Sequence, residues 1–319
     1  MRISVLVLDD VFDLGLSAVL DAFQTANEII QMLKLEVPRF QVYKVGLRRK
    51  IRTAHGLSVV LDPIGARTPD YVFVPAIAFK MPGALEVALE RSDVRDAANV
   101  LQKWARSAAM MTAACIGTFV MAESGLLDKQ HATTTWWLAP LFRSRYPAVV
   151  LDDSSMIVRS GRFVTAGAAL GHMDLALWIV RSMSPHLASL TARYLIADSR
   201  TSQSVYALSD HLMHSDPTVE RFETWARGRL AKGFSLDDAA RSVGASKRTL
   251  ARRMQSVLGK SPLTYFQNLR IEHALHLLRT GQASVDEVAL RVGYSDGATL
   301  RALLRRRLGL GIKEIRKAP

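Results

Sequence analysis

The sequence predicts two domains: an α/β N-terminal domain with a mostly parallel sheet flanked by helices, and an all-α C-terminal domain with two helix-turn-helix units. Three observations lead to this prediction. Short apolar, β-branched runs alternate with helical patterns in the N-terminal half. A pattern of helix, glycine and basic helix occurs twice between Ser235 and Arg316. The charge is also uneven, with 20 Lys and Arg against 9 Asp and Glu from Pro217 onward.

The N-terminal half reads as strands and helices in alternation. Strands are expected at Ile3–Leu8, Phe40–Leu47, Gly56–Asp62, Pro69–Ala76 and Ala108–Cys115, with a strand–loop–strand at Val149–Val164. Helices are expected at Leu16–Leu33, Ala84–Arg106, Gly117–Leu127 and Leu170–Arg181. Buried strands separated by helices predict a parallel sheet with helices on both faces, and such sheets bind ligands at the carboxyl ends of their strands.

The C-terminal part repeats one short pattern, with the turn glycines Gly244 and Gly293 49 residues apart. Glycine suits these turns because it reaches positive φ without a Cβ penalty. Ser246, and either Ser295 or Asp296, are the N-cap candidates of two arginine-rich helices. A long helix between Gly259 and Gly281 would join the two units and fix their separation.

Domain boundaries follow from composition. Residues 1–195 form the predicted sensor domain, 196–216 a linker rich in Ser, Thr, Gln and His, and 217–319 the predicted DNA-binding domain. Tyr206–Met213 is an alternative helical turn within the linker. Residues 1–216 carry 22 Lys and Arg against 20 Asp and Glu, so most of the net charge of +13 lies in the C-terminal part, as phosphate binding requires.

The compartment expected from the sequence is the cytoplasm. The N-terminus lacks the pattern of a secretory signal, and the longest uncharged run, Ser107–Ala122, is too short to span a bilayer. The single cysteine, Cys115, cannot form an internal disulfide. His211 and His214 are spaced i, i+3 without a third ligand, so neither a metal nor another cofactor is expected.

The C-terminal motifs resemble the AraC/XylS family of transcriptional regulators. They are S-x-R-T-L-x-R from Ser246, S-P-x-x-Y from Ser261, Leu269-Arg270, and V-G-Y-S-D from Val292. The resemblance covers roughly the last hundred residues and implies two DNA-binding units around a linking helix. Where the family closes with G-x-x-P, this chain has Gly309 to Ile312, so its last helix is expected to start differently.

Cys115 and Gly117, at a strand-to-helix turn, have the form of a nucleophile elbow. Further motifs are Ala122-Glu123, Gly125–Asp128, Ala132–Thr134 with Trp136, Ala166-Gly167 and Asp174–Leu177. Together they resemble the PfpI-like, class I glutamine amidotransferase-like domain that precedes the AraC-type module in GlxA-type regulators. The resemblance implies a small, nitrogenous effector, such as an amino acid or quaternary amine, and a homodimer formed through the N-terminal half. The candidate ligand-binding residues are Cys115, Asp13, Trp136, Gly167 and His172.

Two departures from the PfpI-like pattern argue against catalysis. Thr135 stands where the family commonly has a histidine, and Ile116 follows the cysteine where catalytic relatives often have one. Thiolate chemistry requires a neighbouring base or cation, which leaves only His131 and His172 as distant candidates. Cys115 is therefore interpreted as the floor of a binding pocket, with a reactive nucleophile and an inert buried thiol as the alternatives. Trp136 and Trp137 offer an aromatic wall for a cation, or core packing.

The two basic helices are expected to contact DNA differently. Arg248 and Arg252 are four residues apart and thus on one helix face, where Arg can bind guanine bidentately, while Leu250 and Met254 are expected to face the core. In the second unit the resemblance puts Ala302 at the base-facing arginine position, so its arginines are expected to bind phosphate. The candidate DNA-binding residues are Lys247, Arg248, Thr249, Ala251, Arg252, Arg253, Thr299, Arg301, Arg305 and Arg306.

The function predicted is that of a sequence-specific regulator of transcription whose N-terminal domain senses a small metabolite without catalysis. Its expected partners are double-stranded DNA, the effector and a second copy of the chain, with RNA polymerase as a candidate and no membrane. The runner-up is a cysteine-dependent amidase or deglycase-like enzyme with a DNA-binding tail. A non-specific architectural DNA binder is a third alternative, which two spaced recognition units disfavour.

Overall fold

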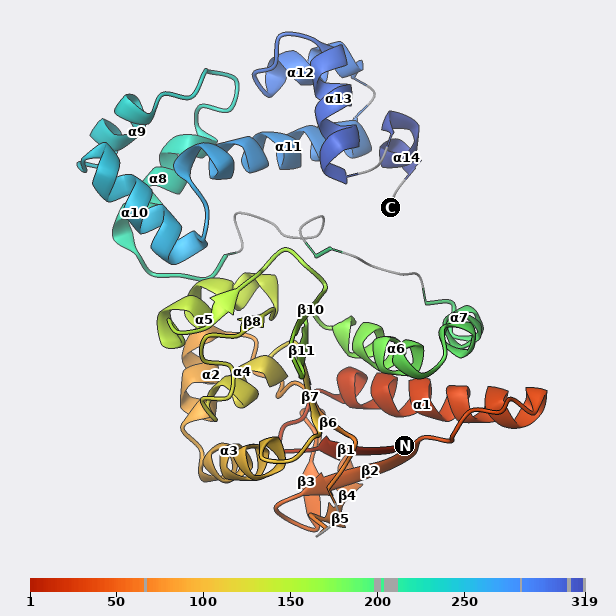
Figure 1. The fold of residues 1–319 in the computed structure, drawn as a ribbon. Coiled ribbons are helices and arrows are strands. Elements are labelled where there is room, and N and C mark those ends of the chain that lie inside the picture. The colour runs from red at the N-terminus through yellow and green to blue at the C-terminus, as the bar shows by residue number, and fades with distance from the viewer. Residues whose placement is uncertain (66–67, 198–201, 204–211, 282, 309–310, 318–319) are drawn as a thin grey trace. The chain divides into compact units, whose positions relative to one another are not determined.

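A computed structural model describes the chain except for residues 66–67, 198–201, 204–211, 282, 309–310 and 318–319 (Figure 1). The chain divides into two compact units, Met1–Ser204 and Val205–Pro319. No helix among the described residues is long and apolar enough to cross a membrane.

The first unit is built on a seven-stranded sheet with the strand order β10-β11-β7-β6-β1-β2-β5. All neighbours pair in parallel except β10 and β11, which form an antiparallel pair at one edge. The strands are β1 (Arg2–Leu6), β2 (Gln41–Gly46), β5 (Asp62–Pro63), β6 (Tyr71–Val74), β7 (Met110–Ala114), β10 (Ile157–Ser160) and β11 (Phe163–Ala166). Two small sheets pair β3 (Lys50–Arg52) with β4 (Ser58–Val60) and β8 (His131–Ala132) with β9 (Val150–Leu151). The mostly parallel sheet confirms the predicted fold class.

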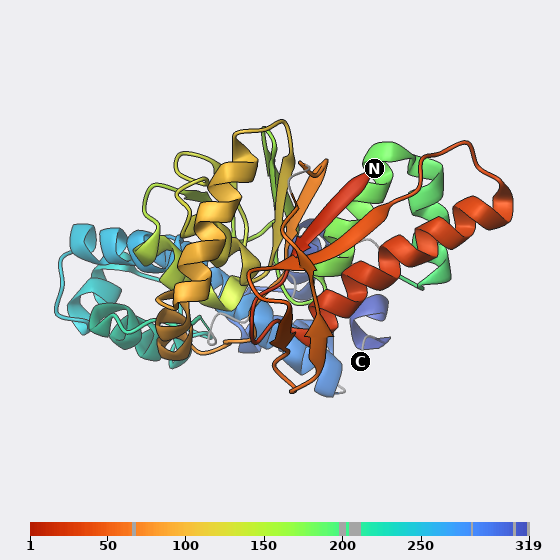
Figure 2. The ribbon, with the colours of Figure 1, turned by 90° about the horizontal axis from the view of Figure 1, so that it is seen from below.

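Alternating side chains of the central strands enter two separate cores. In β6, Val72 and Val74 belong to one core, whereas Tyr71 and Phe73 belong to the other. Helices cover both faces for this reason, as Figures 1 and 2 show. One core contains α2 (Pro82–Leu89), α3 (Ser92–Ala105), α4 (Gly117–Ala122) and α5 (Ala139–Arg145), which follows the 3₁₀ turn η1 (Trp136–Leu138). The other contains α1 (Asp13–Leu33), α6 (Gly171–Met183) and α7 (Pro185–Tyr194).

Two predicted elements are wrong in detail. The helix expected over residues 84–106 is two helices, because the chain is extended at Arg91, whose guanidinium donates to Asp93 and Asp10. The strand expected over residues 56–62 is also divided. Its first part, β4, pairs with β3 in a separate hairpin, and its second part, β5, extends the edge of the main sheet.

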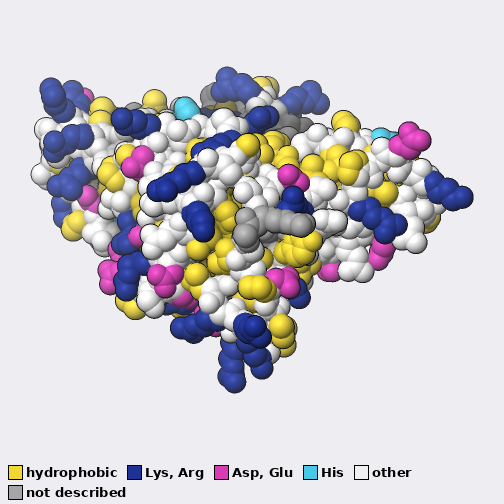
Figure 3. Space-filling model, turned by 60° about the horizontal axis from the view of Figure 1, so that its bottom comes forward, with side chains coloured by type: hydrophobic (Ala, Val, Ile, Leu, Met, Phe, Trp, Pro, Cys, Tyr) yellow, Lys and Arg dark blue, Asp and Glu magenta, His cyan; other side chains and the backbone are white. Residues whose placement is uncertain are grey.

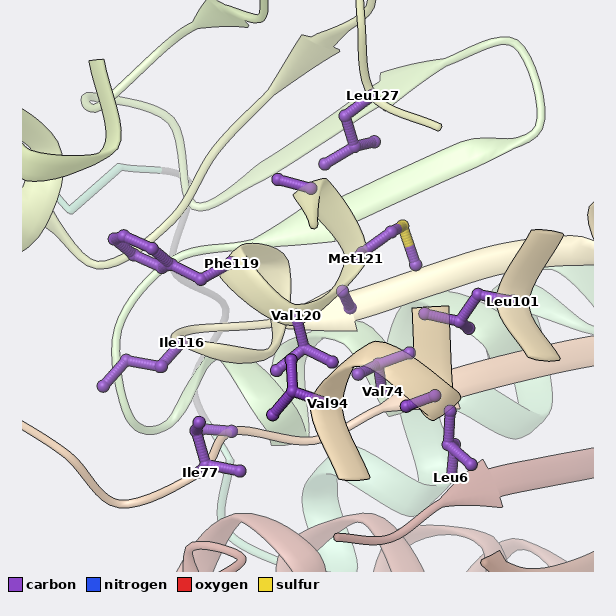
Figure 4. Close-up of a cluster of buried hydrophobic side chains, with 14 of the residues drawn as sticks. Leu6, Val74, Ile77, Val94, Leu101, Ile116, Phe119, Val120, Met121 and Leu127 are labelled. Carbon is purple, nitrogen blue, oxygen red and sulfur yellow. The ribbon is translucent and has the colours of Figure 1, made fainter. Parts of the chain in front are cut away.

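The helix after the elbow, α4, is buried on all sides. Every residue of α4 is buried, and Phe119, Val120 and Met121 are fully inaccessible to solvent. Figure 4 shows these side chains among others from neighbouring elements, including Leu101 of α3 and Val74 of β6. Since a close-packed core resists displacement, this packing fixes the position of the turn that carries Cys115.

The second unit is entirely helical in its described part. It contains α8 (Pro217–Arg227), α9 (Leu236–Ser242), α10 (Lys247–Leu258), α11 (Pro262–Thr280), α12 (Val285–Arg291), α13 (Gly297–Leu308) and α14 (Ile312–Lys317). Helices α9 and α10 form one helix-turn-helix, and α12 and α13 form the other, with α11 between them as the sequence predicts. A separate apolar core joins α11, α12, α13 and α14.

Candidate functional site

Cys115 lies on a sharp turn between β7 and α4, at the carboxyl end of the sheet. Its backbone has a φ of 56°, which is unusual for a residue with a Cβ, and its N–H donates to the carbonyl of Ala166 on β11 at 2.8 Å. A Cβ at Gly117 would collide with the carbonyl oxygens of Val74 and Pro75, so only glycine fits there. The chain thus has the backbone geometry of a nucleophile elbow.

The thiol of Cys115 is not activated. Burial raises its pKa to about 12, and the nearby backbone of Ile116, the Thr135 hydroxyl and the charge of Lys80 only partly oppose this rise. The side chain is 4% exposed. At neutral pH the thiol is therefore protonated, and a protonated thiol is a poor nucleophile.

His172, one of the two histidines considered as a base for Cys115, is held by other groups. Its Nε2 accepts a hydrogen bond from the backbone N–H of Ala76 at 3.0 Å, and its Nδ1 lies 2.7 Å from the carbonyl oxygen of Ala169, which fixes the tautomer with hydrogen on Nδ1. Burial lowers its pKa to about 4. A Cβ at Gly15 would approach Nε2 to 2.7 Å, so the neutral ring fills the space between α1, the loop after β6, and α6. The other candidate, His131, is exposed on β8.

Asp13 begins α1, and one of its carboxylate oxygens is buried without a hydrogen-bond partner among the described residues. Its Oδ2 accepts hydrogen bonds from the backbone N–H of His55 at 3.2 Å and from the ring Nδ1 of His55 at 2.8 Å. Burial alone would raise its pKa, but hydrogen bonds from Thr53 and His55 outweigh burial and lower it. Its Oδ1 is buried and has no hydrogen-bond partner among the described residues. The carboxylate is thus ionised at neutral pH and retains acceptor capacity.

The segment after β8 brings three consecutive threonines to the elbow. Thr133, Thr134 and Thr135 are all fully buried, and the hydroxyl of Thr134 donates to the carbonyl of Cys115 at 2.8 Å. Trp136 and Trp137 follow, both partly buried, with their rings in an edge-to-face contact at 5.6 Å between centroids. Trp137 packs against the core, whereas Trp136 does not belong to either N-terminal core.

Gly167 lies directly after β11, and the side chain of Gln203 occupies the space beside it. A Cβ on Gly167 would overlap the carboxamide of Gln203. The Nε2 of Gln203 donates to the carbonyl of Thr134 at 2.8 Å and to the hydroxyl of Thr133 at 3.1 Å. Sequence reasoning missed Gln203, because it lies in the segment assigned to the linker and no motif there pointed to the elbow.

The first helix-turn-helix has its basic residues on the surface. Gly244 has a φ of 67°, and the hydroxyl of Ser246 caps α10 by accepting from the N–H of Thr249 at 3.1 Å. Leu250 and Met254 are fully buried, as predicted. The exposed residues of α10 include Lys247, Arg248, Arg252 and Arg253, whereas Thr249 and Ala251 are partly buried.

Two of these residues also make ion pairs within the second unit. Lys247 Nζ is 2.9 Å from Asp237 on α9. Arg253 is 3.0 Å from Asp216, which caps the N-terminus of α8. Among the described residues, Arg248 and Arg252 make no ion pair, which leaves both guanidinium groups available for a partner.

The second helix-turn-helix begins with a different set of contacts. Gly293 has a φ of 80°, and Asp296 rather than Ser295 is the N-cap residue, since its carboxylate accepts from the N–H of Thr299 at 2.7 Å. Arg301 lies 3.8 Å from Asp286 of α12. Thr299, Arg305 and Arg306 are exposed, so all predicted contacts of this helix are on the surface. Figure 3 shows a face turned forward from the bottom of the Figure 1 view, where Lys and Arg side chains are scattered among hydrophobic and other residues.

Arg270 on α11 contacts the regions of both helix-turn-helix units. Its guanidinium donates to the carbonyls of Leu230 at 2.9 Å and Lys232 at 3.1 Å, just before α9. The same group lies over the rings of Phe266, at 4.7 Å, and of Tyr294 in the second turn, at 5.4 Å. Arg270 therefore contributes to holding the two recognition helices at a fixed spacing.

Known proteins with similar sequences are helix-turn-helix regulators of transcription. Residues 239–318 match a family model described as a helix-turn-helix domain. The chain is similar to the HTH-type transcriptional regulator GbdR of Pseudomonas aeruginosa, with 25% identity over 299 residues that cover 92% of this chain and 77% of GbdR. It is also similar to the HTH-type transcriptional regulator ArgR of that species, with 25% identity over 220 residues that cover 68% of this chain and 67% of ArgR.

The fold of the N-terminal unit recurs in a solved structure. An AraC family transcriptional regulator from Pseudomonas putida aligns with a TM-score of 0.51 and 18% identity, over 61% of this chain and 98% of that one. The C-terminal unit alone is too short to supply this share, so the match includes the N-terminal α/β fold. The chain is a DNA-binding transcriptional regulator with a helix-turn-helix domain.

Both relatives are named as transcriptional regulators, which favours a DNA-binding regulator over the alternative of an enzyme with a DNA-binding tail. The described residues contain no group of three or more His, Cys, Asp or Glu side chains that could hold a metal ion. His211, half of the His211–His214 pair, lies outside the described residues. His214 Nε2 is instead 3.3 Å from Glu223 of α8.

Proposed function

We propose that this regulator binds a small, nitrogenous effector in its N-terminal unit and performs no covalent chemistry there. The observation that carries the proposal is the state of Cys115. The elbow that would present a nucleophile is intact, but the thiol is buried and protonated, and His172 is fully occupied by backbone groups. An elbow without an activated nucleophile is suited to binding a ligand rather than transforming it.

The proposed effector site is at the carboxyl ends of the parallel strands. Cys115 and Gly167 follow neighbouring strands and form its floor. Asp13 offers an ionised carboxylate whose buried Oδ1 has no hydrogen-bond partner among the described residues, which suits an ammonium or other N–H donor. Trp136 supplies an aromatic ring that suits a cationic group. His172 acts indirectly, by fixing the loops around the site.

The proposed DNA interface is formed by α10 and α13, both of which expose arginines. Arg248 and Arg252 would read base edges from α10, whereas Arg301, Arg305 and Arg306 would bind the phosphate backbone from α13. The proposal further includes a homodimer formed through the N-terminal unit, contact with RNA polymerase at the promoter, and a cytoplasmic location.

The chemistry of Cys115 tests the absence of catalysis. Because burial raises the pKa to about 12, alkylation of the native protein by iodoacetamide at pH 8 should be at least about tenfold slower than that of the unfolded chain. Cys115→Ser should retain ligand-dependent regulation, because it preserves the size of the side chain. Cys115→Phe should abolish the response by filling the site while DNA affinity is unchanged. Rapid alkylation would contradict the unactivated thiol, and amide turnover that Cys115→Ser abolishes would establish an enzyme instead.

The independence of the DNA-binding domain is tested with two fragments. Residues 212–319 keep Asp216, which caps α8, and His214, which contacts Glu223. This fragment should fold and bind DNA without responding to the effector. Residues 217–319 lack both contacts and should be less stable by at least about 1 kcal/mol, the usual value of an N-cap. Urea unfolding and DNA titration of both fragments provide the measurement. An insoluble or DNA-inert longer fragment would show that the domain depends on the rest of the chain.

A further inference from the structure

Gln203 fills a polar site beside Cys115 from a position late in the N-terminal unit. Its side chain is fully buried, which is rare for glutamine. The backbone supports this placement. The N–H of Gln203 donates to the carbonyl of Ser154 at 2.9 Å, and the neighbouring Ser202 forms an isolated antiparallel bridge with Ser155. The segment containing Ser202 and Gln203 is therefore attached to the edge of the candidate effector site.

The atoms around the Gln203 nitrogen are all hydrogen-bond acceptors. Thr133 Oγ1, the carbonyl oxygen of Thr134 and the carbonyl oxygen of Ser155 lie 3.1, 2.8 and 3.5 Å from Nε2; these three atoms form the acceptor cluster. The hydroxyl hydrogen of Thr133 is itself donated to Ser155, at 3.1 Å, so this oxygen is available to accept. A group that occupies the acceptor cluster must therefore carry hydrogen-bond donors, such as the N–H groups that occupy it here, and a carboxylate would be repelled.

The acceptor cluster is continuous with the elbow. Thr134 is joined to Cys115 by its hydroxyl, and Gly167, which the carboxamide of Gln203 covers, follows the residue whose carbonyl accepts from the Cys115 N–H. The fit of Gln203 is incomplete, because its Oε1 is buried without a hydrogen-bond partner among the described residues. A buried, unpaired carbonyl oxygen disfavours the occupied state, so the contact is one that a better donor can replace.

We propose that the carboxamide of Gln203 is a built-in occupant of the effector site, and that an effector with N–H donors, such as a primary ammonium, guanidinium or amide group, displaces it from the acceptor cluster. This inference rests on the proposed function of the N-terminal unit as a sensor. Its consequence follows from the sequence, in which 13 residues separate Gln203 from Pro217 at the start of α8. Displacement releases residues 202–203 from the N-terminal unit, so that effector binding acts on the part of the chain that leads to the DNA-binding domain.

Two substitutions remove the contact from opposite sides in the full chain. Gln203→Leu keeps the volume but removes the N–H donors. Gly167→Ala places a methyl group where the carboxamide lies, and the atoms it meets belong to the flexible end of one side chain. Gln24→Leu on the exposed face of α1 and Gly83→Ala, whose new Cβ would meet nothing within 4 Å, are the matched controls. Hydrogen exchange at the amide of Gln203 or its replacement should be about tenfold faster in the two test variants and unchanged in the controls.

Binding of small probes tests the chemical class. Gln203→Ala vacates the acceptor cluster, so this variant should bind propionamide, detected by ligand-observed NMR, whereas the native chain should not. Propionate should bind neither, and the double variant Gln203→Ala with Gly167→Ala should lose propionamide binding. Equal binding of propionate and propionamide, no binding of propionamide, or unchanged exchange in both test variants would overturn the proposal. DNA titration of the native chain is a separate measurement. Absence of DNA binding would contradict the regulator function, whereas the outcomes above would contradict only the role of Gln203.

Discussion

The two helix-turn-helix units share one scaffold but expose different side chains on their second helices. The turn glycines are 49 residues apart, but the N-cap residues Ser246 and Asp296 are 50 apart, because the second turn contains one additional residue. Burial follows the offset of 50. Leu250 and Leu300 are both fully buried, as are Met254 and Leu304. The buried positions of α10 and α13 therefore match at an offset of 50 residues, and other residues at this offset occupy equivalent positions on the two helices.

This register shows which side chains differ on the exposed faces. Arg248 corresponds to Ala298, and Arg252 corresponds to Ala302; all four are exposed. A methyl group cannot form the bidentate hydrogen bonds by which arginine reads guanine. The first helix-turn-helix thus has arginines at the two positions suited to base contact. The second has its arginines at other positions of the helix.

An acidic residue anchors the start of each recognition helix in its own way. Asp237 pairs with the side chain of Lys247 at 2.9 Å, whereas Asp286, which lies 49 residues later, accepts the backbone N–H of Gly297 at 2.8 Å. A Cβ at residue 297 would come within 2.7 Å of that carboxylate. The glycine therefore brings the second helix into direct contact with α12.

The largest expected effect is that of Arg252→Ala. Loss of a bidentate base contact should cost about 1–3 kcal/mol on the cognate operator and relax the preference at one base pair. Arg252→Lys is the matched control, since it keeps the charge but not the planar pair of donors, and it should lose discrimination while retaining most non-specific affinity. Titration of both variants on cognate and scrambled DNA makes the measurement. A uniform loss on both DNAs would assign Arg252 to the phosphate backbone.

Ala302→Arg tests the comparison in the opposite direction. The substitution gives the second helix the side chain that the first has at the equivalent position. It should improve affinity by about 1 kcal/mol on operators with guanine opposite this residue, found by selection from a randomised half-site. Ala302→Lys, the control, should improve affinity for all sequences alike through charge alone. If both variants select the same sequences as the native protein, residue 302 does not face the bases.

Much of the DNA-binding half could be predicted from the sequence because its signals are local. The glycine turns, the Ser246 cap and the buried positions of Leu250 and Met254 follow from spacing within a few residues. The sequence could not show whether Ser295 or Asp296 caps the second helix, since either side chain can cap a helix. The additional residue in the second turn places Asp296 at the cap.

The effector site was less accessible to prediction because it depends on contacts between distant segments. The elbow at Cys115 is a local pattern, and the structure has it. The occupation of both nitrogens of His172 depends on residues 76 and 169, and the contact between Gln203 and Thr133 joins residues 70 positions apart. Hydrophobic periodicity and local motifs do not predict such pairs, because each pair joins side chains or backbone groups from separate segments of the chain.

The smallest expected effect is that of Arg306→Ala in the second unit. Arg306 is exposed near the C-terminal end of α13, among three consecutive arginines whose positions suit phosphate contacts. Its removal should weaken binding to cognate and scrambled DNA equally and reduce the salt dependence of the logarithm of affinity by about one unit. Arg306→Lys should restore the salt slope, because a phosphate contact requires charge rather than a planar donor pair. Binding measured at several salt concentrations on both DNAs decides the matter. If Arg306→Ala impairs only the cognate site while Arg252→Ala affects both, the roles of the two helices are reversed.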